Sequence, residues 1–172
     1  MSSDAPCMII FCSFEQLHTV IQYAAKYGFK HYIPLVFCKP TSPQVLKANM
    51  RICGATEYAL ILYRDKLPKF RNDGHMVKNY FMIPSGTKYP KVHPTQKNEE
   101  MLKRLISLFT DPGDVVIDPC AGSGSTLRAA YELGRNSYGF ECGKHLYQDA
   151  ISKVLRFKDF ENYKKIETVR LF

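Results

Sequence analysis

A glycine-rich turn between an apolar run and a helix-forming segment has the residue types and the spacing to bind a nucleoside. Val115–Asp118 ends in an acid, Ala121–Gly124 follows, and a helix is expected to begin near Ser125. Glycines let the backbone approach a ligand closely, and a helix N-terminus points free N–H groups and the positive end of its dipole at negative charge. Glu141 lies nineteen residues after Gly122, where an acid can accept hydrogen bonds from both hydroxyls of a ribose.

The same turn discriminates between kinds of ligand. A dinucleotide fingerprint needs a third glycine where this chain has Leu127. A phosphate-binding loop needs a lysine, whereas Arg128 stands here at the wrong spacing from Gly122. A ligand with a ribose and a carboxylate but no pyrophosphate fits better. S-adenosylmethionine (AdoMet) is such a ligand, and nicotinamide cofactors are the alternative.

Strand, turn, helix and second strand together form the nucleotide-binding half of a doubly wound α/β fold. Upstream, the continuous apolar run Cys7–Cys12 predicts a strand buried on both faces, as in a parallel sheet. The runs 32–38 and 57–64 predict two strands that pair antiparallel at one edge of the sheet. Helical spacing with N-cap candidates at Ser13 and Asn98 predicts helices over 14–27, 98–109, 125–133 and 144–156, and residues 168–172 suit a last short strand.

Length and composition fit one globular domain over residues 1–172, since 45% of the residues are apolar and 23% are charged. The N-terminus lacks the basic and apolar regions of a secretory signal, and no apolar stretch reaches the ~18 residues of a membrane span. The six cysteines include no C-x-x-C pair and predict reduced, buried thiols, not a disulfide framework or a zinc site. We therefore expect a cytoplasmic protein without a bound metal.

The net charge of +8 predicts a polyanionic partner, with nucleic acid as the first candidate. Residues 65–92 form a long irregular insertion in which basic residues alternate with aromatic residues, a composition that suits contacts to phosphates and stacking on bases. The alternative is a solvated loop with a few anchoring aromatics: Phe70, Tyr80, Phe81 and Tyr89. The candidate nucleic-acid contacts are Lys39, Arg64, Lys69, Arg71, Lys78, Tyr80 and Lys88.

Several short motifs in a fixed order resemble those of the amino-methylating DNA methyltransferases, which modify adenine N6 or cytosine N4. The motifs are His93–Lys97 (HPTQK), Asp118–Thr126 (DPCAGSGST), Leu133–Arg135 (LGR) and Gly139–Glu141 (GFE), with a helix between the first and the second. Their order is that of the subgroup in which the catalytic motif precedes the AdoMet motif. The resemblance covers residues 91–150 and extends more loosely to the N-terminus.

The resemblance implies a mostly parallel, Rossmann-like sheet, a role in DNA methylation and restriction–modification, and AdoMet as cofactor. Asp118–Thr126 would hold the methionine part, Glu141 the ribose, and His93–Lys97 would close the cofactor site. The alternative for His93–Lys97 is a purely structural role, in which a capped turn only positions the next helix. The candidate cofactor-binding residues are His93, Thr95, Lys97, Asp118, Cys120, Ala121, Gly122, Ser123, Gly124, Thr126, Glu141 and Cys142.

The catalytic motif of this family, an Asp, Asn or Ser followed by Pro-Pro and an aromatic, is absent, since the chain contains no Pro-Pro at all. We therefore assign no catalytic residue. In the resembling fold, the strand with this motif lies between the strands expected at 115–118 and 7–12, so two strand edges should be left open. Three explanations are a truncated or split enzyme, an oligomer that fills the gap, and a degenerate protein kept for binding.

Two functions follow from the resemblance and the missing motif. The first is a DNA methyltransferase, more often adenine-N6 than cytosine-N4 in this family, of which this chain supplies the AdoMet site and the DNA-contact region. A second polypeptide or a second copy would complete its sheet and catalytic motif, in the cytoplasm of a bacterial or phage-infected cell. The second is a catalytically inactive nucleic-acid-binding or regulatory protein on the same scaffold.

Overall fold

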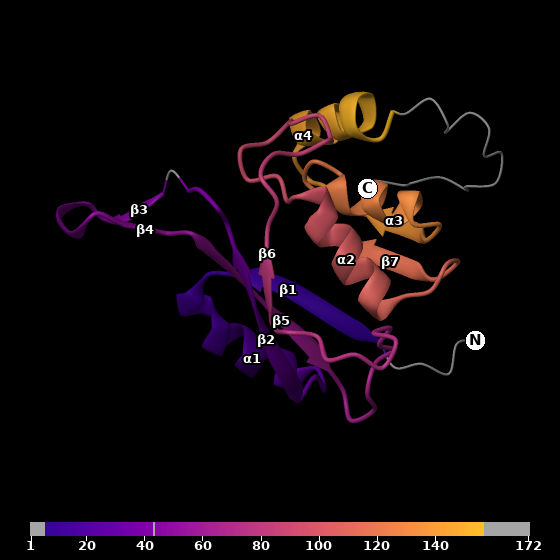
Figure 1. The fold of residues 1–172 in the computed structure, drawn as a ribbon. Helices are drawn as coiled ribbons and strands as arrows, with labels where there is room; N and C mark the ends of the chain where they lie inside the picture. The colour runs from indigo at the N-terminus through magenta and orange to yellow at the C-terminus, as the bar shows by residue number, and fades with distance from the viewer. Residues whose placement is uncertain (1–5, 43, 157–172) are drawn as a thin grey trace. The chain divides into compact units, whose positions relative to one another are not determined.

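A computed structural model describes residues 6–42 and 44–156, and these fall into two compact units that meet in sequence between Ser85 and Gly86 (Figure 1). The boundary falls inside the insertion expected at 65–92, and the interpretation of 1–172 as one domain stays a prediction. The short strand expected at 168–172 and the basic tail lie outside the described residues. None of the described helices has the length and apolar character needed to cross a membrane.

The first unit is built on a sheet with the order β1, β5, β2, β6. β2 (His31–Cys38) and β5 (Thr56–Tyr63) pair antiparallel, as the sequence predicted, and β6 (Tyr80–Met82) is parallel to β2. β1 (Cys7–Cys12) is the expected strand, but it is antiparallel to β5 and half-buried along its whole length. The expectation of a fully buried parallel strand was wrong here, because an apolar run does not report the direction of its neighbour.

The two faces of this sheet hold different cores. On one face, α1 (Leu17–Lys26), preceded by a 3₁₀ turn at Phe14–Gln16, lies over Leu60 and Leu62 of β5, which form a cluster with Ala24. On the other face the ring of Phe37 is fully buried between two aromatic rings, with centroids 5.4 Å from Phe11 and 5.3 Å from Phe81. Phe81 is therefore a core residue, which fits the anchoring role that the sequence left open for the aromatics of 65–92.

A hairpin that the sequence did not predict extends the β2–β5 ribbon. β3 (Val45–Lys47) and β4 (Ile52–Cys53) pair antiparallel around a 3₁₀ turn at Ala48–Met50. Backbone hydrogen bonds from Lys39 N to Ala55 O and from Gly54 N to Gln44 O, both 2.8 Å, continue the pairing from the sheet into the hairpin. Within this unit the hairpin projects beyond the ends of β2 and β5 (Figure 1).

The second unit has the strand–turn–helix–strand order expected from the sequence. α2 (Glu99–Phe109) is followed by β7 (Val115–Asp118), α3 (Ser125–Glu132) and β8 (Asn136–Gly139), and β8 is parallel to β7. The helix expected at 144–156 is divided into α4 (Lys144–Asp149) and a π-helical turn, η3 (Ala150–Val154). Asn98 caps α2 as predicted, because its side-chain oxygen accepts from Glu100 N and Met101 N at 2.9 and 3.2 Å.

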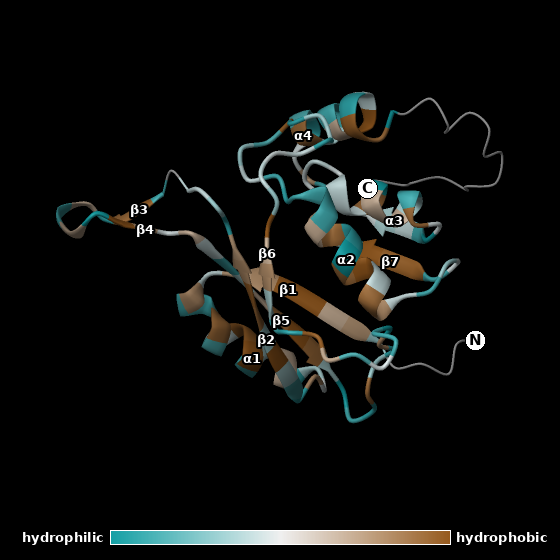
Figure 2. Ribbon diagram, in the orientation of Figure 1, coloured by the Kyte–Doolittle hydropathy of each residue, from teal (hydrophilic) through white to brown (hydrophobic). Residues whose placement is uncertain are grey.

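β1 and β7, the two apolar strands named from the sequence, each have a neighbouring strand on one side only within residues 6–42 and 44–156. β1 pairs with β5 alone and β7 pairs with β8 alone. Figure 2 colours both as hydrophobic over most of their length, and Val115, Ile117 and Tyr138 expose large apolar side chains on one face of the β7–β8 pair. Doubly wound sheets are normally covered on both faces. The sheet is thus partial, with open edges on the two strands named from the sequence.

The cysteines match the sequence interpretation only in part. All six are free thiols, and Cys7, Cys12 and Cys38 are half-buried in strands, where burial raises the pKa of Cys7 to about 11. The other three, at positions 53, 120 and 142, are exposed. The expectation of a buried set fails for these three because they lie in a hairpin and in loops, not in the apolar runs.

Candidate cofactor site

The glycine turn begins where β7 ends. The side-chain Oδ1 of Asp118 accepts a hydrogen bond from Cys120 N at 3.0 Å, which turns the chain back on itself. Gly122 and Gly124 then take positive φ angles of 51° and 78°, a left-handed conformation that is strained for most other residues. The turn is fixed to the next strand because Ala121 N donates to Phe140 O at 2.9 Å.

Glu141 joins the glycine turn to the loop after β8. One carboxylate oxygen accepts from Gly122 N at 2.9 Å and the other accepts from Gly143 N at 2.6 Å. Each carboxylate oxygen has two lone-pair directions, so both retain capacity to accept from a hydroxyl group. The two backbone N–H groups therefore hold the carboxylate in one orientation and leave each oxygen able to accept a further hydrogen bond. Binding a ribose requires this arrangement.

The residue at the third fingerprint position is explained by the packing of α3 on β8. A Cβ atom on Gly139 would lie 2.7 Å from Leu127 Cδ1 and 3.0 Å from Ala121 Cβ. Close approach of helix and strand is thus obtained with the glycine on the strand and the large side chain on the helix, the reverse of the dinucleotide fingerprint. Leu127 is nearly fully buried in this contact.

The remaining turn residues divide between the interior and the surface. The hydroxyls of Ser123 and Ser125 are buried and bonded to each other at 2.9 Å, so the Ser123 side chain stabilises the turn from inside. Gly124 packs under η3, since a Cβ there would lie 3.3 Å from Leu155 Cγ. Thr126 is half-buried in the first turn of α3. Cys120 and Cys142 are exposed.

The segment His93–Lys97 is a compact turn. Thr95 donates from its backbone N to His93 Nδ1 at 3.2 Å, and its hydroxyl lies 2.8 Å from the same atom. Because Nδ1 accepts from a backbone amide, the proton of the neutral ring belongs on Nε2. His93 and Lys97 are half-buried and Thr95 is exposed. A compact turn is compatible with both interpretations of this segment, so closure of the cofactor site and simple positioning of the next helix both stay predictions.

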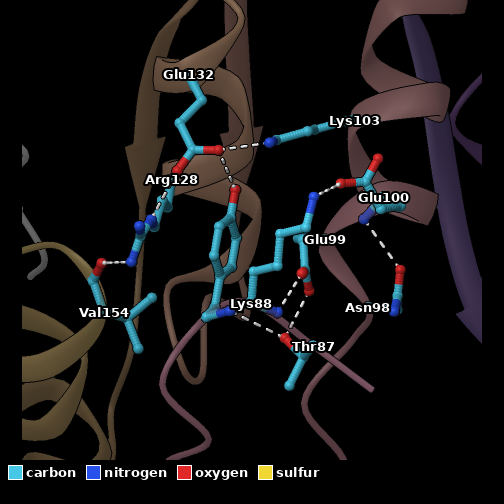
Figure 3. Close-up of polar contacts among 10 residues, drawn as sticks. Thr87, Lys88, Asn98, Glu99, Glu100, Lys103, Arg128, Glu132 and Val154 are labelled. Carbon is cyan, nitrogen blue, oxygen red and sulfur yellow. Dashed lines mark hydrogen bonds and ion pairs between the residues drawn. The ribbon is translucent and has the colours of Figure 1, made fainter. Parts of the chain in front are cut away.

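Glu99 fixes the segment that leads into this turn. Its side chain is only 1% exposed and accepts from Thr87 Oγ1 at 2.5 Å and from Lys88 N (Figure 3). Burial opposes ionisation of this carboxyl, but the hydrogen bonds from Thr87 and from the Lys88 backbone outweigh it and hold the pKa of Glu99 below its ordinary value. Glu99 is thus an internal anchor as well as a helix-start acid.

Glu132, at the end of α3, collects three donors from three segments. Its carboxylate lies 2.5 Å from Lys103 Nζ on α2 and 2.8 Å from Arg128 Nε, and it accepts from the Tyr89 hydroxyl at 2.9 Å (Figure 3). Desolvation opposes ionisation, but these donors prevail and lower the pKa of Glu132. Burial, followed by the bond to Glu132, raises the pKa of Tyr89.

Arg128 completes this group, which we call the Glu132 cluster: Tyr89, Lys103, Arg128 and Glu132. The Arg128 guanidinium lies 4.3 Å from the centre of the Tyr89 ring and donates to Val154 O in η3 at 3.1 Å. The sequence did not predict this cluster. Of the two roles left open for Tyr89, stacking on bases or anchoring the loop, the buried ring fits the anchoring role. The i, i+4 spacing of Arg128 and Glu132 was the one available signal.

Comparison with known proteins identifies the family. Residues 2–152 match the model of the DNA methylase family N6_N4_Mtase. The chain belongs to this family. The chain is 28% identical over 161 residues to the type II methyltransferase M.MjaI of Methanocaldococcus jannaschii, which covers 80% of this chain and 53% of that protein. It is 36% identical over 83 residues to the type II methyltransferase M.BglII from Bacillus subtilis, covering 47% of this chain and 23% of that one.

Solved methylase structures share the fold. The crystal structure of the M1.HpyAVI–SAM complex matches with a TM-score of 0.73 and 26% identity, over 86% of this chain and 74% of that one. The cytosine-N4-specific PvuII DNA methyltransferase matches with a TM-score of 0.67 over 84% of this chain and 62% of that one, and at 18% identity it supports the fold alone. The Rossmann-like α/β prediction is confirmed. The chain spans about half of M.MjaI and a quarter of M.BglII.

The candidate nucleic-acid residues of this methylase-family chain make varied contacts. Lys39 Nζ lies 2.5 Å from Glu57, and Arg64 donates to Tyr27 O at 3.4 Å, so both are engaged within the first unit. Lys78 Nζ lies 3.2 Å from the Tyr80 hydroxyl. Lys69 is half-buried and Arg71 is exposed in the same unit, while Lys88 belongs to the second unit and lies 3.5 Å from Glu100. Their contact with nucleic acid stays a prediction.

Proposed function

We propose that this chain supplies the AdoMet site and the DNA-contact region of an amino-methylating DNA methyltransferase. Residues outside this sequence supply the catalytic motif, either in a longer form of the chain or in a second polypeptide, since a second copy of the chain lacks the motif too. The observation that carries the proposal is the orientation of Glu141 by the backbone N–H groups of Gly122 and Gly143, in a chain of the N6/N4 methylase family. The chain acts in the cytoplasm, on DNA.

AdoMet fits the chemistry of the donors and acceptors at the turn. Glu141 would accept from the ribose hydroxyls, and the positive dipole end at the N-terminus of α3 would favour the methionine carboxylate. The SAM complex of M1.HpyAVI, which shares this fold, supports the choice of ligand. His93, Thr95 and Lys97 close the site, with Asp118, Cys120 and Cys142 at its rim. When bound, AdoMet provides the methyl group.

In this proposal, residues outside the 172 present the base, because the Asp/Asn/Ser-Pro-Pro-aromatic motif is absent from them. The open edge of β1 in the first unit, the open edge of β7 in the second unit and the exposed side chains of Val115 and Ile117 each support the proposal that a strand is missing from the sheet. We propose adenine N6 as the acceptor, as the commoner case in the family. Mass spectrometry of methylated DNA distinguishes N6-methyladenine from N4-methylcytosine, and N4-methylcytosine alone would overturn that choice.

The cofactor assignment is tested by calorimetry with AdoMet on the full chain and on Glu141→Ala. We expect the variant to bind about a hundredfold more weakly, because each lost hydrogen bond to the carboxylate is worth roughly 1.5–3 kcal/mol. Glu100→Ala, a change of the same charge at an exposed site, should bind as the wild type does. The wild type should bind an analogue that lacks the ribose 2′-hydroxyl more weakly than it binds AdoMet, whereas Glu141→Ala should bind the two ligands alike. An equal difference in affinity in both proteins would contradict the assignment.

A second candidate is a catalytically inactive nucleic-acid-binding or regulatory protein on this scaffold. The missing motif and the net charge of +8 favour it. It predicts DNA binding that weakens steeply as salt rises, with no methyl transfer when any polypeptide that carries the motif is added. Incorporation of labelled methyl groups into DNA by such a mixture, lost with Glu141→Ala, would decide for the methyltransferase.

A further inference from the structure

The hairpin of the first unit, residues 44–53, exposes more apolar surface than its size explains. Every residue in it is exposed, and the side chains of Val45, Leu46, Met50 and Ile52 are between 43% and 66% exposed. A two-stranded ribbon without a covering helix or a third strand is only marginally stable in water. Large apolar side chains clustered on such a ribbon mark an interaction surface. We call residues 44–53 the ribbon arm.

The charge of the ribbon arm indicates what it contacts. No Asp or Glu occurs between Lys39 and Glu57, while Lys47 and Arg51 lie on the arm itself. Arg51 takes a left-handed φ of 54° where it ends the 3₁₀ turn at the tip. Two copies of such an arm would bring like charges together. A surface that combines apolar side chains with unopposed positive charge instead fits a polyanion with apolar elements, and duplex DNA is one.

The shape of the arm also fits a DNA groove. The major groove of B-DNA admits a two-stranded β-ribbon, and its thymine methyl groups offer apolar contacts. Leu, Ile and Met side chains can likewise wedge between base steps from the minor groove. Lysine and arginine on the same ribbon reach the phosphates that line the groove and fix the position of the protein.

The arm is continuous with the predicted DNA contacts of the first unit. β6 pairs with the end of β2 from which the arm departs, with Val36 opposite Tyr80 and Cys38 opposite Met82. Exposed Tyr80 therefore lies opposite Val36, two residues before the end of β2, with exposed Lys78 further from the arm, and Lys39 is the first residue after β2. These three were assigned to nucleic acid from the sequence, so the arm extends the surface on which they lie.

We propose that the ribbon arm is a second DNA-contacting element, separate from residues 65–92. Lys47 and Arg51 bind backbone phosphates, and Leu46 and Met50 contact bases or sugars in the groove. The arm thus takes duplex DNA as its ligand, and this inference rests on the proposed function, in which DNA is the substrate.

The phosphate contacts are tested with the full chain and a fluorescent DNA duplex, by anisotropy over a range of salt concentrations. The double variant Lys47→Gln/Arg51→Gln should bind more weakly, and the slope of log K against log salt should shrink by about 1.8, which is roughly 0.9 for each lost phosphate contact. The control, Lys26→Gln/Lys30→Gln, removes the same charge from α1 and the loop after it. If both double variants change the slope equally, net charge alone acts and the proposal is wrong.

The apolar contacts are tested with Leu46→Ser/Met50→Ser. This variant should lose about tenfold in DNA affinity at constant salt, the scale expected for uncovering two large apolar side chains, while its salt slope stays that of the wild type. An exposed hairpin should tolerate the changes, so the melting temperature should be unchanged. If the variant instead converts a dimer to a monomer by light scattering and keeps its DNA affinity, the arm is a self-association surface and the proposal falls.

The outcome separates the arm from the proposed function. AdoMet binding of both arm variants, measured by calorimetry, should equal that of the wild type. Suppose that the wild type binds DNA with a steep salt slope that neither arm variant alters. That result would overturn the proposal that the ribbon arm contacts DNA and would leave the proposed function in place. If the wild type does not bind DNA, the proposal for the ribbon arm and the DNA-contact part of the proposed function both fail. The calorimetry with AdoMet then tests the cofactor part of the proposed function separately.

Discussion

Two carboxylates in the second unit each order a loop through backbone N–H groups, but their surroundings differ. Glu141 is half-buried, holds Gly122 N and Gly143 N, and keeps acceptor capacity on both oxygens. Glu99 is 1% exposed and receives Thr87 Oγ1 and Lys88 N. The comparison teaches that a carboxylate ordering a loop serves a ligand only if solvent can still reach it. Glu141 meets this condition, and Glu99 serves the fold.

The largest effect expected from this comparison is on stability, at Glu99. Glu99→Ala leaves the N–H of Lys88 and the hydroxyl of Thr87 without their buried acceptor, so we expect a loss of about 3 kcal/mol in the free energy of unfolding. Urea denaturation measures it. Glu100→Ala is the matched control, because its side chain is exposed and its ion pair with Lys88 spans 3.5 Å, so it should change stability by about 0.5 kcal/mol or less. Equal losses in both variants would refute the anchoring role of Glu99.

An intermediate effect is expected at Gly143, where the change acts on Glu141 from outside. A Cβ there would lie 2.9 Å from Glu141 Oε1, so Gly143→Ala must move the carboxylate. We expect AdoMet to bind about tenfold more weakly, since a displaced acceptor loses roughly one hydrogen bond to the ribose, and stability to fall by only about 1 kcal/mol. Calorimetry and urea denaturation separate the two. A stability loss without a change in affinity would place Glu141 with Glu99 among the structural acids.

The two acids also differ in how far the sequence could predict them. Glu141 follows a glycine turn at a fixed spacing within one strand–helix–strand unit, so local pattern was sufficient to place it beside that turn, and β7, α3 and β8 lie as expected. Its role in binding a ribose stays a prediction. The partners of Glu99 and Glu132 come from segments without a shared pattern, as Tyr89 and Glu132 are 43 positions apart. Propensity placed Glu99 at a helix start, where it does lie, but could not show that residues 87 and 88 fold back onto it.

The same distinction explains the errors in the first unit. Apolar run and strand length located β1, β2 and β5, but the direction of β1 depends on which strand lies beside it, and a run of apolar residues carries no such information. The aromatics of residues 65–92 look alike in sequence, yet Phe81 and Tyr89 are buried while Phe70 and Tyr80 are exposed. The ribbon arm has no alternating pattern over its short strands, so nothing marked it.

The smallest effect at neutral pH is the pH dependence of stability, and it tests the structural role of Glu99 and Glu132. The folded structure lowers the pKa of both Glu99 and Glu132 from the ordinary value of 4.5. A carboxyl with a lowered folded pKa stabilises the protein fully above its unfolded pKa, and this contribution is lost as pH falls through the folded pKa. We therefore expect no change between pH 7 and 6 from these groups and a progressive loss of stability below about pH 4.5.

Urea midpoints over this range measure the loss, and Glu99→Gln should flatten it, because its side chain does not titrate. An unchanged slope in Glu99→Gln would mean that the donors of Thr87 and Lys88 do not depend on the charge of Glu99, and the contrast with Glu141 would then rest on exposure alone.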